Sequence, residues 1–133
     1  MQRTTIRTTA AGLLTLALIG SGAGAAQAKG SNDGEVRKSG HCSAATVWNL
    51  KAKSDDGRLE VEFEVDSNRN GQRWSVAIND NDVRVFTGAR TTVAPSGSFE
   101  VERHIANRTG TDRITASATN TKTGERCNGV LVY

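Results

Sequence analysis

The clearest chemical pattern in the sequence is a row of acidic side chains that runs into an Asx-rich hexapeptide. Glu60, Glu62, Glu64 and Asp66 occupy every second position, and Asp66 then opens the segment D-S-N-R-N-G. Carboxylate and amide oxygens at alternate positions are typical of calcium loops, and paired carboxylates can divide acid and base catalysis. Which of these applies depends on the elements that carry the residues.

The hexapeptide at 66–71 matches only the first half of an EF-hand calcium loop. Asp66, Asn68 and Asn70 would take positions one, three and five, but position twelve, which needs a bidentate glutamate, is Ala77. The flanking segments also have strand periodicity, whereas an EF-hand needs helices. Asn and Asp before glycine recur in turns because they tolerate left-handed backbone angles. We expect a turn, and a weak calcium site of another kind stays open.

Catalysis and transition-metal binding have little support in the sequence. Alternate residues on one strand face lie about 7 Å apart in water, where nothing raises one pKa relative to its neighbour. Pairing with the preceding segment puts Lys51 about opposite Glu60, which favours a solvated, partly neutralised surface. His41 and His104 have no Cys, His or Asp at ligand spacing, and no nucleophile motif is present. We expect no enzyme activity, no metal site and no cofactor.

Residues 1–28 are predicted to be a secretory signal peptide. Arg3 and Arg7 give a basic start, residues 10–19 form an apolar run too short to span a bilayer, and A-Q-A at 26–28 is a cleavage signal. The expected mature chain is secreted and has no membrane span. Its 15 Lys and Arg against 14 Asp and Glu leave a charge of +1. Nucleic-acid or other polyanion binding by bulk charge is therefore unsupported.

Cys42 and Cys127 are the only cysteines and lie near the two ends of the expected mature chain. In an oxidising compartment we expect them to pair; two free thiols or half a metal site are the alternative. Closing a loop of this length contributes about 4 to 5 kcal/mol to stability in the chain-entropy model.

Residues 29–42 are polar and glycine-rich, so they are predicted to be a flexible lead-in to a folded domain at 43–133.

Short segments of alternating polarity predict an all-β domain. In the clearest of them, 58–66, Leu59, Val61, Phe63 and Val65 alternate with the acidic residues. Seven strands are expected, at 43–53, 58–66, about 74–78, 83–87, about 99–105, about 114–118 and 125–133, with an irregular stretch at 88–97. They favour an antiparallel β-sandwich of immunoglobulin or fibronectin-III type, with a disulfide between its first and last strands. A small closed barrel is the alternative.

Two tryptophans and a set of charges bear on binding. Trp48 and Trp74 share a face with aliphatic neighbours, so we expect them in the core rather than in a sugar-stacking platform.

If the first, second and fifth strands share a sheet, its outer face carries Glu60, Glu62, Glu64, Glu100 and Glu102. The other sheet would then present Arg73, Arg84, Arg113 and Arg126. The simpler explanation is that charges of both signs are spread over the surface for solubility. The more specific explanation is that the arginines form a contact face for an anionic partner.

Several motifs resemble small secreted actinobacterial proteins of uncharacterised function. The motifs are D66-x-N68-x-x-G71-Q72-x-W74, R90-T-T92, S96-G-S-F99, N107-x-x-G110-x-D112 and G124-E-x-C127. The similarity covers nearly all of residues 42–133. It implies export and an immunoglobulin-like β-sandwich, and it implies no activity and no catalytic residue.

The leading hypothesis is a secreted, non-catalytic binding module whose partner is an unknown protein or an anionic cell-wall polymer. Arg73, Arg84 and Arg113 are the candidate contact residues. The first alternative is a proteinaceous inhibitor of secreted hydrolases with a rigid reactive loop in 88–97. The second is a small hydrolase, which needs buried titratable groups that the sequence does not indicate, or His104 in a closed cleft.

Overall fold

The computed structural model describes residues 34–133, which form eight antiparallel strands in two sheets. The predicted all-β sandwich is confirmed, with eight strands in place of seven. The strands are β1 (Val36–His41), β2 (Val47–Asp55), β3 (Arg58–Asp66), β4 (Arg73–Asp80), β5 (Val83–Thr91), β6 (Ser98–Ala106), β7 (Arg113–Asn120) and β8 (Arg126–Val132). The predicted signal peptide, 1–28, lies outside the described residues.

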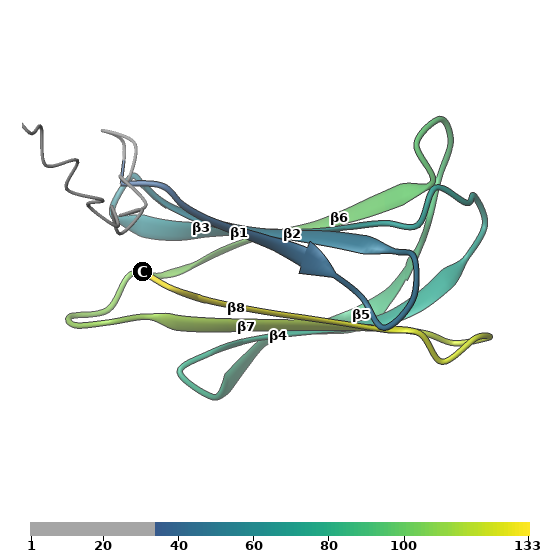
Figure 1. Cartoon of the computed structure of the whole chain (residues 1–133). Coiled ribbons are helices and arrows are strands. Elements are labelled where there is room, and N and C mark those ends of the chain that lie inside the picture. Colours follow the sequence, from purple (N-terminus) through teal and green to yellow (C-terminus); the bar gives the residue numbers. More distant parts are fainter. Residues whose placement is uncertain (1–33) are drawn as a thin grey trace, which may run out of the picture.

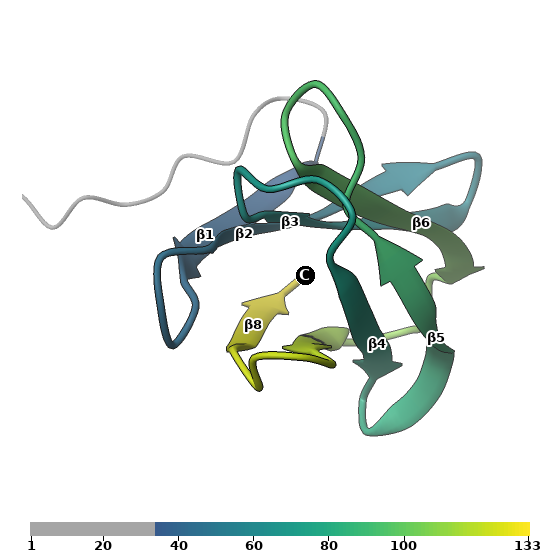
Figure 2. The same ribbon diagram turned by 90° about the vertical axis from the view of Figure 1, so that its right-hand side faces the viewer.

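The two sheets face each other as two layers (Figure 1). One has the strand order β1-β2-β3-β6 and the other β5-β4-β7-β8. Figure 2 shows the same two layers after a quarter turn. The first, second and fifth predicted strands correspond to β2, β3 and β6, so the condition on which the charged faces were considered, that these strands share a sheet, is met. Within residues 34–133, no helix is long and apolar enough to cross a membrane.

Two segments differ from the sequence prediction. Residues 36–41 were expected to belong to a flexible lead-in, but they form β1 and pair with β2 from Val36 opposite Ala52 to His41 opposite Val47. Composition misses this strand because backbone hydrogen bonds, rather than buried side chains, account for most of its contacts. Residues 88–91, expected to be irregular, continue β5 along β4. Gly88 and Ala89 carry no strand propensity of their own, so this extension depends on pairing.

The core lies between the sheets and consists largely of the inward positions that the alternation predicts. In β5 the buried residue is Phe86, whereas Val83, which the alternation placed inward with Val85, is 50% exposed. Both tryptophans are in it, as expected: Trp74 is fully buried and Trp48 is 8% exposed. The other large, fully buried side chains come from both sheets, and they include Leu50, Leu59, Val61, Phe63, Val65, Ile78, Ile114 and Leu131. Burial of such side chains is the main favourable term in folding.

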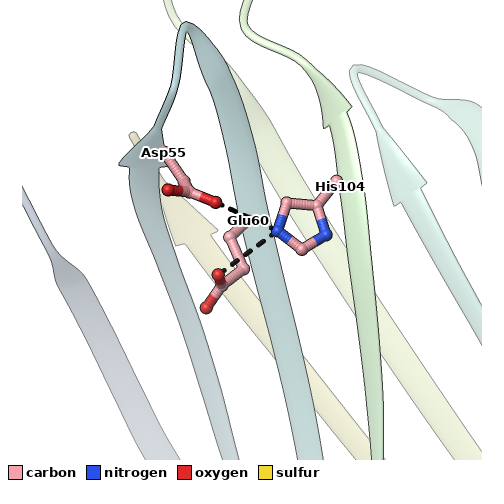
Figure 3. A group of neighbouring side chains, drawn as sticks. All are labelled: Asp55, Glu60 and His104. Carbon is pink, nitrogen blue, oxygen red and sulfur yellow. Dashed lines mark hydrogen bonds and ion pairs between the residues drawn. The ribbon is translucent and has the colours of Figure 1, made fainter.

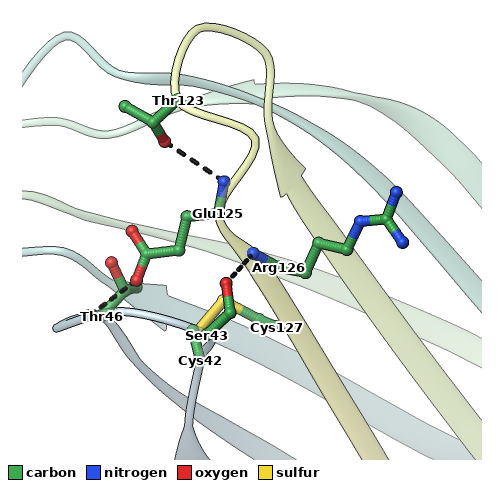
Figure 4. The surroundings of a disulfide bond; sticks show 7 residues. All are labelled: Cys42, Ser43, Thr46, Thr123, Glu125, Arg126 and Cys127. Carbon is green, nitrogen blue, oxygen red and sulfur yellow. Dashed lines mark hydrogen bonds between the residues drawn. A yellow bond between two sulfur atoms is a disulfide. The ribbon is translucent and has the colours of Figure 1, made fainter.

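One side of the sandwich is closed by a tryptophan and a disulfide. The Trp48 indole lies between Gly40 of β1 and Gly129 of β8, and a Cβ at either glycine would come within 2.8 Å of the ring. Two residues away from each glycine, Cys42 and Cys127 form the predicted disulfide (Figure 4). The bond links the end of β1 in one sheet to β8 in the other.

The segment at 66–71 is a turn, as predicted. The backbone N–H of Asn68 donates to Asp66 Oδ1 at 2.9 Å, and Asn68 and Gly71 have positive φ. This turn packs against residues 92–97, because Gly71 N–H donates to the Thr92 carbonyl at 2.7 Å. The Asp66 carboxylate therefore stabilises its own backbone turn.

Replacing both Cys42 and Cys127 by alanine is expected to lower the free energy of unfolding by about 4 to 5 kcal/mol in the chain-entropy model. The cysteines are 85 residues apart, so the bond restricts most of the unfolded chain. The measurement is urea unfolding followed by tryptophan fluorescence, and alanine avoids burying a hydroxyl at position 127. Reduced wild-type protein is the control and should match the variant. A loss of less than about 1 kcal/mol would contradict this role for the bond.

Candidate functional site

Three surface regions are candidates for function. They are the outer face of β5-β4-β7-β8, the outer face of β1-β2-β3-β6 and a cleft at one end of the sandwich. The two outer faces carry opposite charges, and the cleft lies beside the disulfide.

The outer face of β5-β4-β7-β8 carries four exposed arginines and no acidic side chain at its outward strand positions. We call this surface the arginine face. Its arginines are Arg73, Arg84, Arg113 and Arg126, each at or beside the start of its strand. None of the four has an ion-pair partner among the described residues. Their charges therefore remain available to an external anion.

The predicted contact residues do not form one cluster. Because β4 runs antiparallel to β5 and β7, Arg84 and Arg113 lie toward one end of the arginine face and Arg73 toward the other. The length of a strand separates the two ends by about 20 Å. Arg126, which begins β8, lies toward the same end as Arg73.

Between its two ends, the arginine face is neutral and made of small side chains. Ser, Thr, Asn, Ala and Val occupy the remaining outward positions, in a register that aligns them across the four strands. They are Ser75, Ala77, Asn79, Thr87, Ala89, Thr91, Thr115, Ser117, Thr119, Asn128, Val130 and Val132. Such a surface offers hydroxyl and amide groups for hydrogen bonds and adds no charge.

The opposite surface, the acidic face, carries the five glutamates that the sequence placed together. They are Glu60, Glu62, Glu64, Glu100 and Glu102. Glu62 lies directly opposite Glu102 on the neighbouring strand, and Glu64 lies opposite Glu100. Like charges in this position destabilise a sheet.

Two carboxylates of the acidic face, those of Glu60 and Glu100, differ in pKa, whereas the sequence offered no reason to expect one pKa to be raised relative to its neighbours. Partial desolvation, followed by the charges of Glu62, Glu64 and Glu102, raises the pKa of Glu100. Hydrogen bonds with Glu62 and then Lys53 lower the pKa of Glu60. The sequence prediction took into account only the spacing of carboxylates along one strand. In the structure, Glu60 and Glu100 also have charged neighbours on the adjacent strands, and these change their pKa values.

The lysines pair with this face in a register two residues away from the predicted one. Lys53 Nζ lies 3.0 Å from Glu60 Oε1, and Lys51 pairs with Glu62, whereas Lys51 was expected opposite Glu60. The reason is the tight turn between β2 and β3. Asp56 and Gly57 alone form the tip of this turn, and both have positive φ. The pairing of β2 with β3 therefore continues up to Asp55 and Arg58, which places Lys53 opposite Glu60.

At one end of the acidic face, His104 lies between carboxylates from two other strands (Figure 3). Its Nε2 atom is 3.2 Å from Asp55 Oδ2 and 3.3 Å from Glu60 Oε2. Its Nδ1 atom is 3.7 Å from Glu102 Oε1. The imidazole is 37% exposed, so His104 lies on an open face rather than in a closed cleft.

Sequence spacing could not reveal this cluster, because β2, β3 and β6 each contribute one of Asp55, Glu60 and His104. The signal lies in the strand register. Once β3 is paired with β6, Glu60 stands directly opposite His104, and the β2–β3 turn brings Asp55 beside them.

The cleft at the disulfide end has a volume of about 380 Å³ and is lined by three loops. Residues 43–46, 67–72 and 123–125 contribute its walls, with Arg69, Gln72 and Glu125 as its larger polar side chains. Glu125 Oε1 accepts a hydrogen bond from Thr46 N–H at 2.9 Å (Figure 4). The volume suits a small ligand, but the cleft lacks the aromatic lining typical of such sites.

Asp80 and Asp112 form a buried carboxyl pair that the sequence did not indicate. Asp80 is 2% exposed and Asp112 is fully buried. Burial, followed by the nearby charge of Asp112, raises the pKa of Asp80. The chain therefore has buried titratable groups, which sequence patterns alone did not reveal. Both groups are nevertheless too deep to contact a substrate.

No family model matches the chain, and neither a curated protein nor a solved structure is significantly similar to it. The predicted resemblance to secreted actinobacterial proteins therefore stays a prediction. Function has to be inferred from the faces and side chains of the chain itself.

Replacing Asp80 by Asn is expected to stabilise the protein at neutral pH. A carboxyl group whose pKa is raised in the folded state contributes stability at low pH, and this stability is lost as the pH rises through the folded-state pKa. An amide avoids that loss because it stays neutral. The thermal midpoint should therefore rise more at pH 7 than at pH 4.

Calorimetry at the two pH values measures the effect of the Asp80 substitution, with Asp82→Asn as the matched control. Asp82 lies in the turn that follows Asp80 and is exposed, so its replacement should change the midpoint little at either pH. An equal shift at both pH values in Asp80→Asn would show that charge is not the cause.

Proposed function

We propose that this protein is a secreted, non-catalytic binding module that holds an anionic polymer through its arginine face. The observation that carries the proposal is the separation of charge between the two outer faces. Four exposed arginines and no acidic side chain occupy one face, whereas the other carries five glutamates, two of which pair with Lys51 and Lys53. Such a surface attracts anions locally even though the net charge is small.

The spacing of the arginines favours a polymer over a small anion. Arg73 and Arg113 lie at opposite ends of the face, about 20 Å apart along the strands. A single phosphate or carboxylate would contact only one end. A chain with repeated anionic groups could contact both ends, and the hydroxyl and amide side chains between them suit a sugar or polyol backbone. An anionic bacterial cell-wall polymer has this chemistry.

The fold and the compartment support the same proposal. A disulfide is consistent with an extracellular protein, and the predicted signal peptide would direct the chain there. The order β2-β3-β6 opposite β5-β4-β7-β8 supports an immunoglobulin or fibronectin-III-like assignment, with β1 as an added strand. Sandwiches of this type commonly use a sheet face or end loops for binding.

A second candidate function, hydrolase inhibition, is favoured by the rigid segment at 92–97. Thr92 is buried, its N–H donates to the Gln72 carbonyl at 2.9 Å, and its hydroxyl donates to the Arg69 carbonyl. Val93 beside it is 59% exposed. A fixed backbone with a projecting side chain is what an inhibitory loop requires. The rest of the predicted loop, 88–91, belongs to β5.

Co-sedimentation with bacterial cell walls, with and without their phosphate polymers, tests the proposed function. Wild-type protein should sediment with intact walls and be released by salt, because exposed charges are screened. The triple variant Arg73→Glu, Arg84→Glu, Arg113→Glu should bind at least about tenfold more weakly, since each exchange replaces attraction by repulsion.

The matched control places the same charge change on the other sheet, as Arg37→Glu, Lys38→Glu, Arg58→Glu. These residues are exposed and lie in β1 and β3. The control should retain most of the wild-type binding. Equal loss in both variants would attribute binding to net charge, and a wild-type protein that stays in the supernatant would refute wall binding through the arginine face.

A further inference from the structure

We propose that Asp55, Glu60 and His104 form a binding site for a divalent transition-metal ion such as Zn²⁺. The site lies on the outer face of β2, β3 and β6, opposite the arginine face, so it is independent of the proposed polymer binding. Its donor set is one imidazole nitrogen and two carboxylate oxygens.

The three donor atoms lie within 4.8 Å of one another, and the two distances that involve His104 Nε2 fit a tetrahedral ion. Zinc binds nitrogen and oxygen ligands at about 2.0–2.1 Å, so two ligands at the tetrahedral angle are about 3.3 Å apart. His104 Nε2 is 3.2 Å from Asp55 Oδ2 and 3.3 Å from Glu60 Oε2. The side chains could hold such an ion with little movement.

The cluster has more hydrogen-bond acceptors than donors, which also favours a bound cation. Ionised carboxylates only accept hydrogen bonds, and one imidazole nitrogen carries at most one proton. Two carboxylate oxygens converge on that single nitrogen (Figure 3). At most one of them receives a well-aligned hydrogen bond, whereas a doubly charged ion between the three atoms would interact favourably with all of them.

The surrounding residues hold the donors in place. Glu60 is 7% exposed, and its Oε1 atom pairs with Lys53 Nζ at 3.0 Å, which leaves Oε2 directed at the imidazole. β3 is paired on both sides, with β2 and β6, so its backbone is fixed. Glu102 Oε1, 3.7 Å from His104 Nδ1, lies where an outer carboxylate would orient the ring of a metal-bound histidine.

The donor chemistry selects the class of ion. Calcium and magnesium prefer sites made of oxygen alone, whereas imidazole suits zinc, copper and nickel. Three protein ligands leave a fourth tetrahedral position for water or for an oxygen of a bound partner. Because the imidazole is 37% exposed, that position opens onto solvent.

Isothermal titration of the purified, disulfide-bonded protein with ZnCl₂ tests the proposal, with CaCl₂ titrated in parallel. We expect one zinc ion per chain and weaker calcium binding. His104→Gln and Asp55→Asn should each lower the zinc affinity at least about tenfold, as loss of a ligand does. The matched control is His41→Gln, which removes the other histidine, at the end of β1, and should leave the affinity unchanged.

A second readout follows the two histidine rings by NMR during the zinc titration. The His104 resonances should shift with saturation at one equivalent, while those of His41 stay in place. Unchanged zinc affinity in His104→Gln, equal affinity for calcium and zinc, or equal shifts of both histidines would overturn the proposal. Each would instead indicate diffuse attraction of cations to the acidic face.

Discussion

The link between Cys42 and Cys127 is the constraint on which the rest of the structure depends. It joins the end of β1 to β8 and therefore one sheet to the other. The indole of Trp48 fills the space beside it, between glycines that admit no side chain. This closure holds the exposed strand β1 in place, and it fixes the loop at 43–46 against Glu125, which lines the cleft.

The sandwich separates the requirements of folding from those of binding. Inward positions share one core and must be apolar in both sheets, whereas outward positions can diverge. On one sheet they collect glutamates, two pairs of which face each other at a cost to stability. On the other they collect arginines without acidic neighbours. A nearly neutral domain thus presents two surfaces that would attract different ligands.

Local alternation in the sequence predicted much of the fold, and long-range pairing explains what it missed. The pattern at 58–66 specified a half-buried strand, and Trp74 was placed in the core because it shares a face with aliphatic neighbours. Strand β1 was missed because pairing, not composition, orders it. The cluster around His104 and the buried pair of Asp80 and Asp112 were missed because their members come from different strands or turns.

Mapping contacts at residue level would show whether the arginine face is the binding surface. Backbone amide shifts can be followed by NMR while a soluble polyol phosphate is added to the disulfide-bonded protein. Binding through the arginine face predicts shifts concentrated in β4, β5, β7 and β8, strongest near Arg73, Arg84 and Arg113. Shifts concentrated in β2, β3 and β6, or in the loops around the cleft, would contradict it.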